Sequence, residues 1–169
     1  AGLAAGGKGE GFLMKGAGPV IAVIGNGLED DTLNALAEQT GYLIAESGCV
    51  LVNGGLAGVM RASAKGAKSR GGLTIGFLPG TDPGAANQYI DIPIATGLGE
   101  MRNLLIVRSA AVVIAIGGGY GTLSEIALAL KASKPVIGLK TWEVSSDITK
   151  ATDAPGAVRS ALSFLKGRL

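Results

Sequence analysis

The stretch AIGGGYGTLSEIALAL, residues 115–130, contains the groups in this sequence that are best suited to chemistry. A glycine-rich turn, residues 117–121, follows an apolar run and leads into a helical pattern. Backbone N–H groups at the start of a helix have no helical partner and carry partial positive charge, so those of residues 119–122 can hold a phosphate together with the Thr122 hydroxyl. The pattern predicts ligand contacts from Gly118, Gly119, Tyr120, Gly121 and Thr122.

Glu125 follows this turn and has two interpretations. As a carboxylate beside a bound ligand, it can stabilise developing positive charge or assist a water molecule. Alternatively, Thr122-Leu-Ser-Glu125 fits a capping box, in which the glutamate accepts a hydrogen bond from the backbone of the capping residue. Spacing alone does not decide between catalysis and capping.

Arg102, in the segment GEMRNLL, bears on this choice. It follows a predicted strand, so we expect it at the same edge of the sheet as the glycine turn, where an arginine can bind phosphate in a bidentate manner. The alternative is a surface ion pair, for example with Glu100, which would contribute little. Glu125 and Arg102 are therefore the candidate catalytic residues.

Two earlier glycine turns add candidate ligand contacts. The turn NGGLAGVM, residues 53–60, can either present backbone N–H groups to an anion or simply be a compact turn. The turn at residues 25–27 lacks the third glycine of a dinucleotide-binding fingerprint, and no acidic residue ends the next strand, so a nicotinamide cofactor is not expected. The candidates from these turns are Gly25, Asn26, Gly54, Gly55, Gly58 and Met60.

Composition excludes several function classes. The chain has no histidine, which removes Ser-His-Asp catalysis and most zinc sites, and we expect no metal. Its single cysteine, Cys49, cannot form an internal disulfide and lies in an apolar run that predicts burial. The net charge of +2 and the aromatic content of 4% do not indicate nucleic-acid binding. No apolar run is long enough to span a membrane, so we expect a cytoplasmic protein.

Alternating strand and helix patterns must position these residues. Apolar runs predict about six strands, at residues 19–27, 49–55, 73–80, 90–97, 110–119 and 134–140. Helical patterns lie at residues 33–44, 57–70, 99–110 and 122–132, with a last helix opening at 153–155. Pro93 argues that the fourth strand lies at an edge, and residues 141–152 are expected to form a polar loop.

This order predicts an α/β fold, a single Rossmann-like, doubly wound and mostly parallel sheet with helices on both faces. The domain is expected to span residues 19–169, after a flexible tail or cloning remnant at residues 1–18. In such sheets ligands bind beyond the carboxyl ends of the strands. The glycine turns all follow strands, so they are expected to converge at that edge.

The segment GGGYGTLSE, read with GEMRN upstream, resembles the Lonely Guy-like (LOG) Rossmann superfamily, whose members are often mislabelled lysine decarboxylases. The family motif is Pro-Gly-Gly-x-Gly-Thr-x-x-Glu, and here Gly117 replaces the proline. The family arginine, usually followed by lysine, matches Arg102 followed by Asn103. Residues 54–60 are similar to the family's Gly-Gly-x-x-x-Gly-x-Met turn, one residue tighter. The resemblance covers residues 19–140 and is strongest to the short branch of molybdenum-cofactor carrier proteins.

The resemblance leaves three candidate functions. In the phosphoribohydrolase branch, the enzyme cleaves the N-glycosidic bond of a nucleoside 5′-monophosphate; by resemblance, the glycine turns hold the phosphate and Glu125 and Arg102 act on the nucleotide. We expect this activity, with no required cofactor and no lysine decarboxylase activity. The alternative is a non-catalytic carrier that binds the phosphorylated pterin of the molybdenum cofactor as cargo. A nucleotide sensor that binds without cleavage is a third reading.

Family members are dimers or tetramers, so a homo-dimer or homo-tetramer is expected, with no membrane or nucleic-acid partner.

Overall fold

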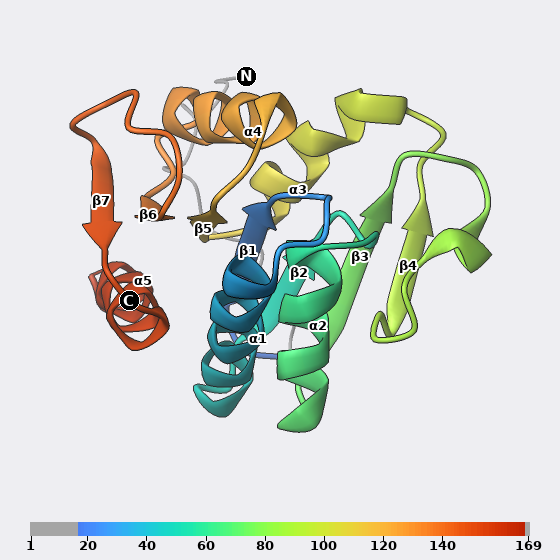
Figure 1. The fold of residues 1–169 in the computed structure, drawn as a ribbon, viewed down its shortest axis with the longest axis horizontal. Helices are drawn as coiled ribbons and strands as arrows, with labels where there is room; N and C mark the ends of the chain where they lie inside the picture. Colours follow the sequence, from blue (N-terminus) through green and yellow to red (C-terminus); the bar gives the residue numbers. More distant parts are fainter. Residues whose placement is uncertain (1–16, 168–169) are drawn as a thin grey trace, which may run out of the picture.

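The computed structural model describes residues 17–167, which form one seven-stranded sheet with helices on both faces (Figure 1). The expected tail at residues 1–18 lies outside the described residues, apart from its last two. The strands are β1 (Val20–Gly25), β2 (Val50–Asn53), β3 (Thr74–Leu78), β4 (Ile92–Ala95), β5 (Val112–Ile116), β6 (Val136–Leu139) and β7 (Ile148–Ala151). The helices are α1 (Asp31–Glu46), α2 (Val59–Ser69), α3 (Asn103–Ser109), α4 (Tyr120–Lys131) and α5 (Ala154–Lys166), with 3₁₀ turns η1 (Pro83–Ala85) and η2 (Gly99–Arg102).

All neighbouring strands pair in parallel, in the order β4-β3-β2-β1-β5-β6-β7. The order reverses at β1, which pairs with β2 on one side and β5 on the other, and this reversal is where doubly wound sheets form their ligand crevice. The predicted α/β Rossmann-like fold is confirmed, and β4 lies at the edge as Pro93 indicated.

The expected loop at residues 141–152 was wrong in part, because it contains the edge strand β7. Ile148 is buried and pairs with Val136, but Thr149 and Lys150 are polar. An edge strand with a single buried apolar residue has too short a pattern to be distinguished from a loop. The sheet therefore has seven strands among the described residues rather than about six.

The core lies on both faces of the two central strands, β1 and β5, in which nearly every residue is buried. One apolar cluster joins the sheet to α1, α2 and α5, and a second joins it to α3 and α4. Strands that are buried on both faces must be apolar without alternation, which explains the continuous runs VIAVIG and VVIAI. This rigid centre holds the ends of β1 and β5 in place at the carboxyl edge.

Helices α1 and α2 pack closely because glycines lie at their contact. A Cβ atom on Gly66 would collide with the carbonyl oxygen of Glu38, and one on Gly41 would collide with that of Ser63. Both of these oxygens belong to the backbone and cannot move aside as the end of a flexible side chain can, so the helices would have to separate. This contact fixes the position of the turn that precedes α2.

We expect Gly66→Ala to lower the free energy of unfolding by about 2 kcal/mol, because the collision outweighs the helix propensity gained, which is about 1 kcal/mol. Urea denaturation of both proteins measures the change. Gly80→Ala is the control, since a Cβ atom there meets nothing within 4 Å; it should alter stability by less than about 0.5 kcal/mol. A Gly66→Ala protein as stable as the parent would contradict this account of the helix contact.

Candidate functional site

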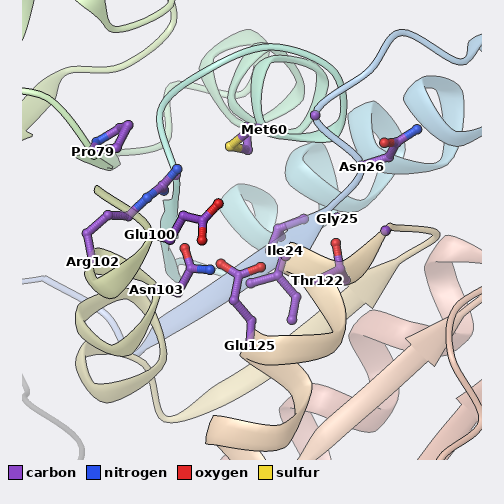
Figure 2. Close-up of a pocket in the computed structure, with 15 residues that line it drawn as sticks. Ile24, Gly25, Asn26, Met60, Pro79, Glu100, Arg102, Asn103, Thr122 and Glu125 are labelled. Carbon is purple, nitrogen blue, oxygen red and sulfur yellow. The ribbon is translucent and has the colours of Figure 1, made fainter. Parts of the chain in front are cut away.

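A pocket of about 320 Å³ opens at the carboxyl edge of the sheet, where its strand order reverses. Its walls come from the end of β1 and its following turn, the turn before α2, the segment of Pro79 and η2, and the first turns of α4 (Figure 2). Backbone and small side chains form much of the lining, so main-chain groups are accessible to a ligand. The sequence placed the site at this edge, and the structure brings its parts together there.

Helix α4 begins at Tyr120, two residues earlier than expected, with Gly119 as its N-cap. Its first helical hydrogen bond is donated by the Leu123 N–H to the Gly119 carbonyl. The N–H groups of Gly121 and Thr122 precede this bond, and both residues line the pocket. The helix start therefore presents free donors and the positive end of its dipole to the pocket.

The capping-box interpretation of Glu125 is wrong. The helix starts at Tyr120, so Glu125 is in the second turn, and the N-cap is Gly119, which has no side chain with which to form a capping box. Glu125 instead lines the pocket and is only 7% exposed. Figure 2 shows its carboxyl group directed into the space that it shares with Arg102 and Asn103.

Arg102 is buried at the opposite side of the pocket, 8% exposed, and is not a surface ion pair. Its Nη1 donates to the Phe77 carbonyl at 2.9 Å, whereas the buried Nε has no hydrogen-bond partner among the described residues. Gly54 leaves room for the guanidinium, since a Cβ atom there would collide with Nη1. An arginine anchored at one nitrogen with another donor unpaired is suited to bind an anionic group.

Burial dominates the electrostatics of both charged groups. It raises the pKa of Glu125 from 4.5 to about 7, and the charge of Arg102 opposes this rise. Burial also lowers the pKa of Arg102, which the charge of Glu125 opposes. Among the ion pairs within 4.0 Å in residues 17–167, none joins these two side chains. The pocket thus separates two buried groups of opposite charge that interact without touching.

Side chains from the segment after β6 hold the glycine turn before α4. The Thr141 hydroxyl donates to the Gly117 carbonyl at 2.6 Å, and the Trp142 Nε1 donates to the Gly119 carbonyl at 3.1 Å. Asn103 Nδ2 lies 3.2 Å from Ser124 Oγ and donates to it, joining the segments that carry Arg102 and Glu125. These bonds fix the relative positions of the two charged groups.

Most of the predicted ligand contacts line this pocket. Together with Arg102 and Glu125, they are Gly25, Asn26, Gly54, Met60, Gly119, Gly121 and Thr122. Their roles in ligand binding stay predictions. The sequence signal that predicted these residues was their position after strands, at the carboxyl edge of the sheet.

Four predicted contacts do not line the pocket: Gly55, Gly58, Gly118 and Tyr120. The Gly55 N–H donates to Asn53 Oδ1 at 2.8 Å and the Gly58 N–H to Glu29 Oε1 at 3.2 Å, so these donors are already used. The turn before α2 is therefore the compact turn of the alternative interpretation at these two positions. Tyr120 is 82% exposed and stacks on Trp142. Gly118 packs against Thr122, where a Cβ atom would collide.

Six lining residues were missed: Val23, Ile24, Gly27, Pro79, Glu100 and Asn103. Glu100 and Asn103 lie within two residues of the predicted Arg102 in the segment GEMRN, and this proximity is the signal that could have identified them. Val23 and Ile24 belong to a buried strand, and nothing in the pattern distinguishes them from core residues.

The structure also bears on metal binding and on membrane insertion. Within residues 17–167, no three His, Cys, Asp or Glu side chains gather as metal ligands do. None of the helices in that range has the length and apolar character needed to cross a bilayer.

The chain was compared with known proteins. The model of the SLOG cluster4 family matches residues 18–163. A protein of Archaeoglobus fulgidus described only as uncharacterized is 54% identical over 120 residues, 71% of this chain and 79% of that protein.

Two solved structures are also similar. The molybdenum cofactor binding protein from the phototrophic bacterium Rippkaea orientalis is 40% identical, with a TM-score of 0.82, over 87% of this chain and 97% of that one. The molybdenum cofactor carrier protein from Chlamydomonas reinhardtii is 38% identical, with a TM-score of 0.81, over 88% of this chain and 98% of that one. These matches confirm the resemblance to the LOG-like superfamily.

Glu125→Gln should change how stability depends on pH. The folded-state pKa of Glu125, about 7, lies above its ordinary value of 4.5, so the folded chain holds this proton more tightly than the unfolded chain. The stabilisation is complete below pH 4.5 and is lost as pH rises to 7. At about 1.4 kcal/mol per pKa unit, the loss is about 3 kcal/mol.

The neutral glutamine avoids this loss. Relative to the parent, the Glu125→Gln protein should gain about 3 kcal/mol between pH 4.5 and pH 8, measured by urea denaturation. Glu143→Gln is the matched control, because Glu143 is an exposed residue paired with Lys150. A constant stability difference between parent and Glu125→Gln at both pH values would show that Glu125 does not titrate as described.

Proposed function

The chain belongs to the SLOG cluster4 family, and from this premise we propose that it binds the molybdenum cofactor and carries it without chemical change. Two similar structures are named for binding or carrying this cofactor, and this chain aligns with nearly the whole length of each. The observation that carries the proposal is the buried guanidinium of Arg102, held by the Phe77 carbonyl at one nitrogen only, which shares a pocket with the free N–H groups at the start of α4. Donors that are left unpaired in a buried site favour a ligand that brings acceptors.

The lining fits a phosphorylated ligand. Arg102 supplies a charged donor, and Gly121 and Thr122 supply backbone donors at the positive end of a helix of 12 residues. Gly54 lacks a side chain, which would displace the Arg102 guanidinium from its place in the pocket. We infer that these residues hold the phosphate of the pterin, while Asn26 and Met60 contact its remainder.

Hydrolysis of a nucleoside 5′-monophosphate is the second candidate, favoured by one observation. A buried carboxyl group, Glu125, faces the same pocket as Arg102. A carboxylate there would stabilise the positive charge that develops on ribose as an N-glycosidic bond breaks. The carrier has the stronger support because both cofactor-binding relatives share the whole fold at about 40% identity.

Arg102→Met should reduce retention of the cofactor at least tenfold, because it removes a charged donor while keeping the buried volume. Purified protein is incubated with molybdenum cofactor and passed through gel filtration, and the molybdenum that co-elutes is measured. Arg108→Met is the matched control, since Arg108 is an exposed residue of α3 outside the pocket. Equal retention by the parent and Arg102→Met would remove the basis of the proposal.

An assay with AMP and CMP separates carrier from hydrolase. The carrier function predicts that no free base appears. If base is released and Glu125→Gln abolishes the release, the chain is a phosphoribohydrolase, and the proposal that it carries its ligand without chemical change is wrong.

We also propose that the chain assembles as a homo-oligomer through one apolar surface. Exposed apolar side chains gather on β4, η2 and α3: Ile92, Ile94, Leu98, Met101 and Leu104. Ile92 and Ile94 pair with half-buried Ile75 and Phe77 of β3, which pack against the cluster beneath α3. In soluble proteins, exposed apolar side chains that lie together mark a protein–protein contact.

Met101→Glu should shift the assembly toward monomer, because Met101 is the most exposed residue of this proposed surface, at 77%, and a charge there opposes desolvation. Light scattering coupled to gel filtration measures the mass. Phe164→Glu on α5, across the sheet, is the control and should leave the mass unchanged. A monomeric parent protein, or an equal effect of both substitutions, would contradict the proposed interface.

A further inference from the structure

We propose that Glu125 binds the anionic group of the ligand as a neutral carboxylic acid, so that the pocket takes up one proton together with the anion. This inference rests on the proposed function insofar as the natural ligand is anionic. It assigns Glu125 the role of a hydrogen-bond donor, which differs from that of a catalytic carboxylate.

The first step is the balance of charge in the pocket. Three titratable side chains line it: Arg102 and Glu100 from η2, and Glu125 from α4. The walls from β1, from the turn before α2 and from Pro79 contribute no titratable group. With both glutamates ionised the pocket would be net negative, and it would oppose entry of a phosphate. Protonation of Glu125 leaves Arg102 and Glu100 balanced.

The two glutamates differ in their surroundings. Glu100 is exposed, so water screens its charge, whereas Glu125 is buried. Only a buried group gains substantially from becoming neutral, because burial penalises the charged form. Glu125 is therefore the residue whose protonation adapts the pocket to an anion.

The ionised form of Glu125 lacks the hydrogen bonds and close cations that would stabilise a buried carboxylate. Among the described residues, no hydrogen bond involves its carboxyl group and no cation lies within 4.0 Å of it. The free N–H groups of α4 lie one turn before it and point along the helix axis. Burial raises the pKa of Glu125 to about 7, so the proton is available near neutral pH. A bound anion further disfavours a second negative charge, and the acid O–H can donate to it.

The direct test is the titration of Glu125 in the intact chain, followed by carboxyl ¹³C NMR and assigned with Glu125→Gln. The probe is sodium sulfate, whose charge is constant between pH 5 and 9, compared with sodium chloride at equal ionic strength. We expect sulfate to raise the midpoint of Glu125 by at least half a pH unit, a threefold change in proton affinity. A midpoint that is unchanged or lowered by sulfate would overturn the proposal.

A second test uses the cofactor itself. Retention of molybdenum cofactor by the parent should fall at least threefold from pH 7 to pH 8.5, and Glu125→Gln should abolish this dependence because its side chain is always neutral. Glu143→Gln should behave as the parent does. If Glu125→Gln keeps the pH dependence of the parent, the proposal is wrong.

The two tests separate this inference from the proposed function. A sulfate-induced rise in the midpoint, with no cofactor retained at any pH, would support proton uptake and remove the cofactor as ligand. Retention of the cofactor without any sulfate effect or pH dependence would keep the carrier function and remove proton uptake.

Discussion

The site depends on two buried side chains of opposite charge, Arg102 and Glu125, which face one pocket without forming an ion pair. Removing charged groups from water is costly unless they are closely paired and hydrogen-bonded. Here Arg102 keeps one bond, to the Phe77 carbonyl, and leaves Nε unpaired, while Glu125 responds with a pKa near 7. We propose that a bound ligand recovers the free energy lost in this arrangement by bringing matching groups.

The rest of the fold keeps this arrangement from collapsing. Strands β1 and β5 form a buried, apolar centre, and the turns that follow them provide two walls of the pocket. A shift of η2 relative to α4 would change the separation of Arg102 and Glu125, which those two segments carry. The Asn103–Ser124 hydrogen bond and the bonds from Thr141 and Trp142 to the glycine turn oppose such a shift. Gly54 contributes by leaving room for the guanidinium.

The sequence predicted the parallel α/β fold because buried strands and glycine turns alternate with helical patterns, and it placed Arg102 and Glu125 at one edge. It did not reveal β7, whose single buried apolar residue carries too little pattern. The capping-box reading failed because Tyr120 and Gly121 already belong to the helix, and nothing local to Thr122 shows that. Gly55 and Gly58 were expected to bind an anion, but Asn53 and Glu29 use their N–H groups, and the contact with Glu29 joins residues far apart in the chain. Burial of Arg102 and Glu125 likewise depends on tertiary packing.

The central claim is that this pocket receives an anionic group between Arg102 and the start of α4. A crystal structure of the chain grown with inorganic phosphate tests it most directly. The account predicts a phosphate with one oxygen within hydrogen-bond distance of the Arg102 guanidinium and another within reach of the N–H groups of Gly121 or Thr122. A pocket without phosphate at concentrations that fill other anion sites, or a phosphate bound only at the start of α2 in place of the Glu29 carboxylate, would contradict it.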